Sequence, residues 1–186
     1  MARLIYSAFT SLDGYVADET GSFDWAELSD EVHAFINSRE RQIGTYLFGR
    51  KIYETVAVWE SPDGLPGLTP TALEFAPIWQ AAEKIVYSTT LPRVTTARTR
   101  LERSFDAEAV RELKAGARRD LAVGGPTLAA QAIRAGLVDE YHLLIAPVIA
   151  GGGIPYLPGK VSVKLELLDE RSFDNGLVYV RYRAKS

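Results

Sequence analysis

The chain has 186 residues, of which 47% are hydrophobic and 24% charged, and its formal net charge is −3. This balance predicts a single soluble domain over residues 1–186 and offers no electrostatic basis for binding nucleic acid or an anionic membrane. No apolar run approaches the ~20 residues that a membrane helix needs. The sequence contains no cysteine and two histidines, which excludes thiol chemistry and favours a reducing cytoplasm and a protein without a metal site.

The first half of the chain is predicted to alternate strands and helices. Residues 3–10 are apolar enough for a strand buried on both faces. The stretch 11–25, which holds three aspartates and two glycines, is predicted to be a long surface loop. Ser29 is expected to cap a helix over 30–40. The next predicted elements are a strand over 45–48, a helical segment over 51–56, a helix over 71–82 and a strand over 84–87.

The second half continues this alternation and then changes to antiparallel pairing. The patterns predict a strand over 99–103, a helix over 106–116, a short buried strand over 121–123, a helix from Pro126 to about Ala135, and an apolar strand over 138–148. Asn175-Gly176 lies between two alternating segments and predicts a hairpin. We therefore predict a three-layer α/β fold: a mainly parallel mixed sheet, helices on both faces, and a C-terminal antiparallel hairpin.

Four of the predicted strands are followed by glycine-bearing turns, at Gly14, Gly49, Gly124-Gly125 and Gly151–Gly153. Backbone N–H groups at the start of a helix attract anions, and phosphate is a frequent ligand there. A tight strand-to-helix connection that binds nothing is the alternative at any one of these turns. Because ligands of α/β sheets bind beyond the carboxyl ends of the strands, the four turns together predict one cleft for an extended, phosphate-bearing molecule.

Polar side chains accompany two of these strand ends. Arg50 directly follows Gly49, and its planar guanidinium matches phosphate oxygens, although a surface salt bridge is the commoner role of an arginine. The hydroxyls of Ser88 and Thr89 follow another strand and are further candidates for phosphate or ribose contact. His33 is expected to be a partly exposed helix residue, and His142 a core or dimer-face residue.

Four motifs occur in one order along nearly the whole chain: SLDGYVA (11–17), GRKIYE (49–54), VYSTTL (86–91) and the long GGPTLAAQAIRAGLVDEYHLLIAPVIAGGG (124–153). In this order they resemble dihydrofolate-reductase-like proteins, especially the C-terminal reductase domain of bacterial riboflavin biosynthesis and its stand-alone relatives. The resemblance implies a dihydrofolate reductase-like fold, NADPH as cofactor, and a homodimer. The apolar segments 141–145 and 179–183 are expected at a sheet edge, where a second copy would protect them.

The resemblance also implies roles for individual residues. Arg50 would bind the 2′-phosphate, with Gly49 and Lys51 on the adenosine side and Ser88 and Thr89 flanking it. The residues implied at the pyrophosphate are Gly124, Gly125, Pro126, Thr127 and Leu128, and those implied at the nicotinamide are Ala8, Val16 and Ala17. A cis peptide bond is implied between the paired glycines. Two departures weaken the case that the chain catalyses the riboflavin-pathway reaction itself. Val123 stands where those reductases typically have a glutamate, and the zinc-binding deaminase is absent from the sequence.

The catalytic candidates are Asp13 and Asp30. Trp25 and Asp30 have the spacing of the tryptophan and acid of folate enzymes, but Asp30 equally suits a solvent-exposed first helical turn, and Asp13 equally suits a loop cap. Trp25 and Tyr53 are the candidates for substrate contact, or are core aromatics. We expect an NADPH-dependent reductase that transfers a hydride to a small pterin- or pyrimidine-like heterocycle. The alternative is an NADPH-binding or sensing protein without turnover, because the cofactor turns are clearer than any catalytic group.

Overall fold

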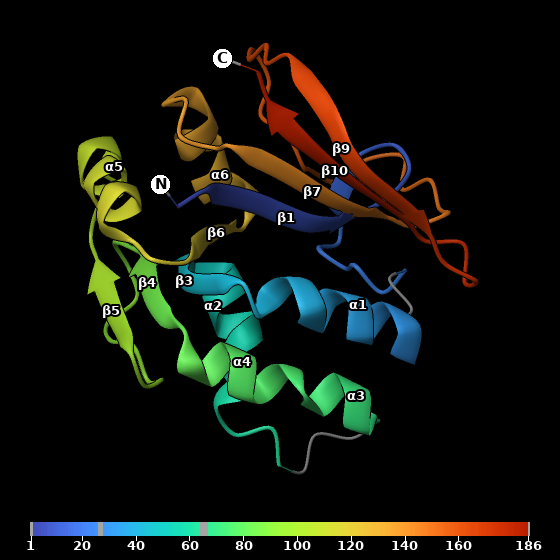
Figure 1. Cartoon of the computed structure of the whole chain (residues 1–186), viewed down its shortest axis with the longest axis horizontal. Helices are drawn as coiled ribbons and strands as arrows, with labels where there is room; N and C mark the ends of the chain where they lie inside the picture. Colours follow the sequence, from blue (N-terminus) through green and yellow to red (C-terminus); the bar gives the residue numbers. More distant parts are fainter. Residues whose placement is uncertain (1, 26–27, 64–66, 186) are drawn as a thin grey trace.

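The computed structural model describes residues 2–25, 28–63 and 67–185. At its centre lies an eight-stranded sheet with the strand order β5-β4-β3-β6-β1-β7-β10-β9 (Figure 1). Its strands are β1 (Leu4–Thr10), β3 (Ile43–Gly49), β4 (Glu83–Tyr87), β5 (Thr99–Glu102), β6 (Asp120–Gly124), β7 (Glu140–Ile145), β9 (Leu165–Ser172) and β10 (Val178–Ala184). A second, two-stranded sheet pairs β2 (Tyr15–Ala17) with β8 (Ile154–Pro155).

The six strands from β5 to β7 run parallel, and β10 is antiparallel to both of its neighbours, β7 and β9. The predicted mainly parallel sheet with a C-terminal antiparallel hairpin is therefore confirmed. Because β1, β3, β4 and β6 point the same way, the turns that follow them meet at one edge of the sheet.

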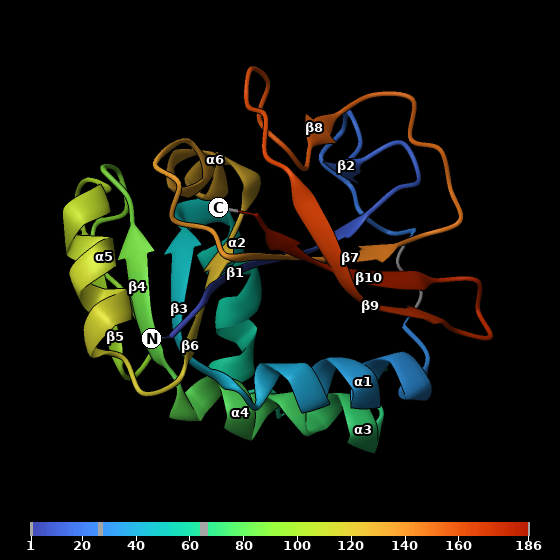
Figure 2. The ribbon, with the colours of Figure 1, turned by 45° about the horizontal axis from the view of Figure 1, so that its top comes forward.

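Helices cover both faces of the sheet (Figures 1 and 2). One face carries α1 (Asp30–Glu40), α2 (Arg50–Val56), the 3₁₀ turn η1 (Ala57–Glu60), α3 (Pro70–Leu73) and α4 (Phe75–Ala81). The other carries α5 (Ala107–Gly116) and α6 (Pro126–Arg134). In β1, Leu4 and Tyr6 pack in the core on the α5–α6 side, while Ile5 packs with Tyr46 and Trp79 on the opposite side. This two-sided burial explains why the central strands are apolar almost throughout.

Most predicted elements have the expected type and position, with two informative differences. The predicted helix over 71–82 is divided into α3 and α4, which meet at Glu74. Pro77 lacks the N–H that would bond to Leu73 and its ring crowds that carbonyl, so a continuous helix is disfavoured at this point. The predicted loop over 11–25 contains the short strand β2, whose partner β8 lies almost 140 residues later and gives no local signal.

The expectation that residues 141–145 and 179–183 lie at a sheet edge is wrong. Strand β7 pairs with β1 and β10, and β10 pairs with β7 and β9, so the edge strands are β5 and β9. The more charged strand of the hairpin, β9, occupies the exposed position, while Tyr179 of β10 is buried. Within the described residues, no helix is long and apolar enough to cross a lipid bilayer.

Candidate functional site

The turns after β3 and β6 lie against each other at the carboxyl edge of the sheet. A Cβ atom added to Gly49 would lie 3.9 Å from the Cβ of Leu128 in α6. A Cβ added to Gly125 would lie 3.2 Å from Cγ2 of Ile52 in α2. The residues expected at the adenosine and pyrophosphate parts of the cofactor are therefore brought together by adjacent strand-to-helix turns.

Both glycines of the β6–α6 turn are required by their surroundings. A Cβ at Gly124 would lie 2.8 Å from the Phe48 ring, closer than side chains tolerate. Gly125 has φ +89° and ψ 130°, a conformation that is strained for any residue with a side chain. The expected cis bond between them is wrong, because no peptide bond among the described residues is cis.

In the part of the chain that the structure describes, the helices that directly follow β3 and β6 have no side-chain cap, and neither does α4, which continues from α3. Helices α1, α3 and α5 each receive a side-chain cap, from Ser29, Thr69 and Asp106 respectively. Helices α2 and α6 follow Gly49 and Gly125, and no described side chain caps either of them. The first N–H groups of α6 therefore lack both an intrahelical acceptor and a side-chain acceptor, which suits them to bind an anion.

Arg50 spans the gap between two strand ends. Its Nε donates to Oε1 of Glu54 at 2.8 Å, and its Nη1 donates to Oγ1 of Thr90 at 3.0 Å, in the loop after β4. These bonds use two of the five N–H donors of the guanidinium. In the same loop the hydroxyl oxygen of Ser88 accepts the backbone N–H groups of Thr90 and Leu91, at 3.2 and 2.9 Å. Ser88 thus shapes the loop, while Lys51 and Thr89 are exposed.

The residues expected at the nicotinamide lie on the other side of the β6–α6 turn, around β1 and β2. Ala8 and Val16 are half-buried against the α5–α6 core, and Ala17 is buried. The backbone of Gly153 approaches Ala17 so closely that an added Cβ would lie 2.1 Å from the Ala17 carbonyl oxygen. The last of the four glycine turns is therefore packed directly against β2.

Asp13 binds the loop that follows β7. Its Oδ1 accepts the N–H of Ala150 at 3.0 Å, and its Oδ2 accepts the N–H of Gly151 at 2.8 Å. The Ser11 hydroxyl and these two amides lower the pKa of Asp13 to about 2. At neutral pH this side chain is an anion with both oxygens engaged, which makes it a poor proton donor.

Trp25 and Asp30 have separate partners. Asp30 is exposed at the start of α1, and its Oδ1 accepts the hydroxyl of Thr69 at 2.5 Å. Trp25 is half-buried against the apolar cluster that contains the α1 residue Val32, and its indole N–H is buried without a hydrogen-bond partner among the described residues. This leaves an indole donor at the edge of an apolar cluster.

Tyr53 is 2% exposed and packs with Phe48 and Trp79 in the core. Its hydroxyl oxygen accepts the Thr95 N–H at 2.9 Å and lies 3.3 and 3.2 Å from the hydroxyls of Thr95 and Thr96. These contacts anchor the segment before β5. The structure does not bring Tyr53 together with Trp25.

A family model for the RibD C-terminal domain matches residues 2–179. The chain belongs to the RibD C-terminal domain family. It is 29% identical to the uncharacterised protein YyaP of Bacillus subtilis (strain 168), over 97% of this chain and 94% of YyaP.

Two solved structures show which fold the chain shares. A Shewanella sp. PV-4 protein provisionally assigned to riboflavin biosynthesis superposes with a TM-score of 0.74 at 21% identity, covering 100% of both chains. Dihydrofolate reductase from Enterococcus faecalis, complexed with NADP(H) and RAB-propyl, superposes with a TM-score of 0.65 at 15% identity, covering 99% of this chain and 97% of the enzyme. This RibD C-terminal-type chain therefore has a dihydrofolate reductase-like fold.

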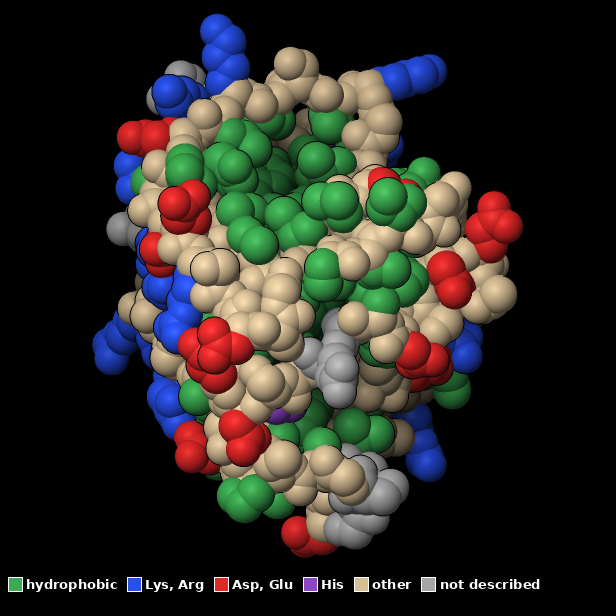
Figure 3. Space-filling view, turned by 90° about the vertical axis from the view of Figure 1, so that its right-hand side faces the viewer, with side chains coloured by type: hydrophobic (Ala, Val, Ile, Leu, Met, Phe, Trp, Pro, Cys, Tyr) green, Lys and Arg blue, Asp and Glu red, His purple; other side chains and the backbone are tan. Residues whose placement is uncertain are grey.

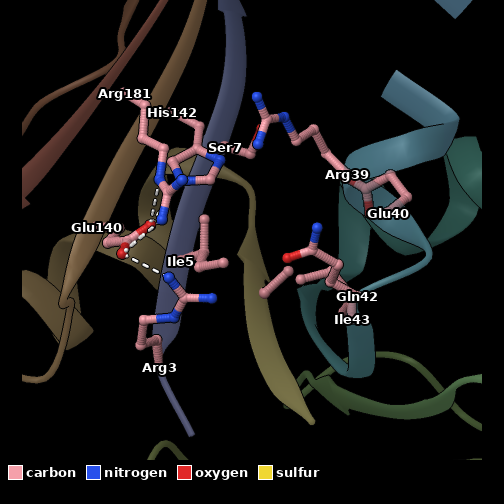
Figure 4. Close-up of a pocket in the computed structure, with 11 residues that line it drawn as sticks. Arg3, Ile5, Ser7, Arg39, Glu40, Gln42, Ile43, Glu140, His142 and Arg181 are labelled. Carbon is pink, nitrogen blue, oxygen red and sulfur yellow. Dashed lines mark hydrogen bonds and ion pairs between the residues drawn. The ribbon is translucent and has the colours of Figure 1, made fainter. Parts of the chain in front are cut away.

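The RibD C-terminal-type fold also contains a polar pocket that sequence reasoning missed, between α1 and strands β1, β7 and β10 (Figure 4). At its base lies Glu140, 1% exposed, whose carboxylate accepts bonds from Arg3 at 2.8 Å and Arg181 at 2.8 and 3.1 Å, and lies 3.0 Å from Nε2 of His142. Burial raises the pKa of Glu140, but the bonds from His142 and Arg181 outweigh it, so the pKa falls below its ordinary range. The cavity of about 20 Å³ holds roughly one water molecule, not a heterocycle.

A second surface feature is apolar. The face to the right of Figure 1 shows hydrophobic side chains gathered in a hollow in its upper half (Figure 3). Exposed apolar residues occur on the edge strand β9, on its partner β10 and in the segment before β9: Val163, Leu165, Leu167 and Val178. Soluble monomers rarely leave contiguous apolar surface uncovered.

Proposed function

We propose that the protein is an NADPH-dependent reductase that acts on a pterin- or pyrimidine-like heterocycle. One observation carries the proposal. Helix α6 starts at the carboxyl edge of the sheet, beside the turn that presents Arg50, and among the described residues no side chain caps it. An uncapped helix start suits a pyrophosphate, and a guanidinium suits the additional phosphate that distinguishes NADPH from NADH.

The proposed cofactor contacts follow the order of the strands. Gly49, Arg50 and Lys51 would bind the adenosine side, with Ser88 and Thr89 beside the 2′-phosphate. The start of α6, from Gly124 to Leu128, would bind the pyrophosphate. Ala8, Val16 and Ala17 would border the nicotinamide. The relationship to an NADP(H)-bound dihydrofolate reductase of the same fold supports this assignment. When bound, the nicotinamide supplies the hydride, and the chain supplies orientation and exclusion of water.

The proposed substrate side lies on the α1 face, where Trp25 and Phe9 offer apolar surface for a flat ring and the Trp25 indole N–H remains without a partner among described residues. Asp30, at the start of α1, is the proposed acidic residue of the substrate site, where its carboxylate would accept a hydrogen bond from the heterocycle. Its exposed carboxylate is held by a single threonine hydroxyl and can exchange that bond for one to a substrate.

A second candidate, binding of NADPH without turnover, is favoured by one observation. The carboxylates of Asp13 and Asp30 and the hydroxyl of Tyr53 all have protein partners. Loss of nicotinamide absorbance during incubation with pterins, folates and pyrimidines separates the two candidates. We expect oxidation of NADPH with at least one class of heterocycle. Binding without absorbance loss across the panel would favour the non-catalytic candidate.

We also propose a cytoplasmic homodimer formed through the apolar surface of β9 and β10. Leu167 is 49% exposed on an edge strand, where a second copy can cover both the side chains and the unpaired backbone groups. Sedimentation velocity measures this directly. A dimer that Leu167→Glu converts to monomer supports the assignment, whereas a monomeric wild-type protein contradicts it.

A further inference from the structure

Two loops far apart in the sequence form one unit at the carboxyl edge. The N–H of Leu12 donates to the carbonyl of Val148 at 2.7 Å, and the N–H of Tyr156 donates to the carbonyl of Gly14 at 2.9 Å. Next to the second bond, β2 pairs with β8. The loop after β1 and the loop after β7 therefore cannot move independently near their ends.

Asp13 joins the middle of these loops. Its two carboxylate oxygens accept two consecutive backbone N–H groups, of Ala150 and Gly151, at 3.0 and 2.8 Å. A carboxylate is suited to this arrangement because each oxygen accepts a separate donor. Gly151 has φ +77°, a left-handed conformation that favours glycine.

The position of this loop determines the position of β2. An added Cβ on Gly153 would lie 2.1 Å from the Ala17 carbonyl oxygen and 2.7 Å from Cα of Asp18. An added Cβ on Gly152 would lie 2.9 Å from Oε1 of Glu19. Because Gly153 lies this close to the backbone of residues 17 and 18, a shift of Gly153 toward β2 would displace those residues.

We infer that Asp13 is a positioning residue for the nicotinamide half of the cofactor site. It acts through the amides of Ala150 and Gly151, which hold residues 152–153 against β2 and so fix Val16 and Ala17. The inference rests on the proposed NADPH site. Of the two roles that the sequence left open for Asp13, catalytic residue and loop cap, the inference develops the second.

The adenosine half provides an internal reference. Arg50 and Ser88 follow β3 and β4, and β6 separates these strands from β1. A change at Asp13 should therefore affect NADPH and hydride transfer while leaving a ligand that carries only the adenosine half, 2′,5′-ADP, unaffected.

The test compares Asp13→Asn with the wild-type protein. Asparagine keeps one acceptor oxygen but turns an NH₂ group toward the other backbone N–H, so one bond is lost. With whichever heterocycle of the panel oxidises NADPH, we expect kcat/KM to fall about 10- to 100-fold, mainly in kcat, because displaced reactants react more slowly. Affinity for 2′,5′-ADP should stay within about twofold, since its phosphates bind elsewhere. Hydrogen exchange at the amides of Ala150 and Gly151 should accelerate.

Two further variants complete the test. Asp24→Asn makes the same charge change on an exposed residue of the same loop and should match the wild type. Asp13→Glu restores two acceptor oxygens and should recover part of the kcat. If Asp13→Asn has the hydrogen exchange and kinetics of the wild type, the inference is wrong but the proposed function stands. The same holds if NADPH and 2′,5′-ADP lose affinity equally. Failure of the wild-type protein to bind NADPH would overturn the proposed function and the inference together, and the exchange data would then show the loop contact by itself.

Discussion

The Glu140 pocket and the glycine turns at the carboxyl edge differ in how far their charged and polar groups are already paired within the protein. In the pocket beneath α1, the buried Glu140 is surrounded by Arg3, Arg181 and His142, and Asp120 also pairs with Arg3. At the carboxyl edge, α2 and α6 start from glycine and no side chain that the structure describes caps them, and Arg50 is exposed with two of its donors engaged.

This difference assigns the Glu140 pocket to stability and the glycine turns to binding. A buried carboxylate with three partners has no free acceptor for a ligand, and its surroundings suit a structural role. Helix starts and a guanidinium with unused donors cost little in the folded protein and become valuable when a phosphate arrives. Pocket shape alone would direct attention to the Glu140 pocket, whereas the inventory of free donors directs it to the glycine turns.

Replacing Glu140 with glutamine should have the largest effect and should fall on stability. The substitution leaves Arg181 and Arg3 around a neutral buried group, which we expect to lower the free energy of unfolding by about 3 kcal/mol. Denaturant unfolding measures this loss, with Glu170→Gln on β9 as the exposed control. NADPH affinity should remain at the wild-type value. A parallel loss of affinity would contradict the assignment of Glu140 to stability and of the glycine turns to binding.

Replacing Gly124 with alanine should affect cofactor binding more than stability. The new Cβ would press on the Phe48 ring and shift the start of α6, so we expect NADPH affinity to fall on the order of 100-fold. The added methyl group should also lower stability by about 2 kcal/mol. Fluorescence titration measures the affinity. Gly116→Ala, whose Cβ would meet no atom within 4 Å, is the matched control. Unchanged affinity in Gly124→Ala would argue for a turn that binds nothing.

Replacing Arg50 with alanine should change cofactor preference. We expect about 30-fold weaker binding of NADPH, the size of a lost charged hydrogen bond, and little change for NADH, which lacks the 2′-phosphate. Arg111→Ala removes a comparable surface ion pair with Glu108 on α5 and should leave both affinities unchanged. Equal losses for NADPH and NADH in Arg50→Ala would remove Arg50 from its assigned role.

The smallest expected effect is a pH dependence of stability. Burial lowers the pKa of His142, so the unfolded chain binds this proton more readily than the folded one. The free energy of unfolding should therefore decrease from about pH 7.5 to about pH 5.5. His142→Gln should reduce the slope of unfolding free energy against pH. The part of the slope that comes from His33, whose pKa burial also lowers, should remain. A slope that His142→Gln does not alter would contradict this origin.

The sequence predicted what local patterns determine and missed what distant pairing determines. Helix α1 begins and ends where Ser29 and the pattern of apolar residues predict, and the glycine turns were visible as strand ends. The Asp13 contact and the Glu140 pocket were not, because their partners lie roughly 40 to 140 residues away and depend on strand order. For Tyr53 the sequence left substrate contact and core packing open, and its side chain is buried in the core.

Titration calorimetry of the wild-type protein with NADPH, followed by NADH, tests the central claim most directly. The convergence of the α6 start and Arg50 on one dinucleotide predicts saturable uptake of NADPH with one site per chain, and weaker uptake of NADH. No heat of binding at millimolar NADPH would contradict the cofactor site, and with it the assignment of this family member as a reductase.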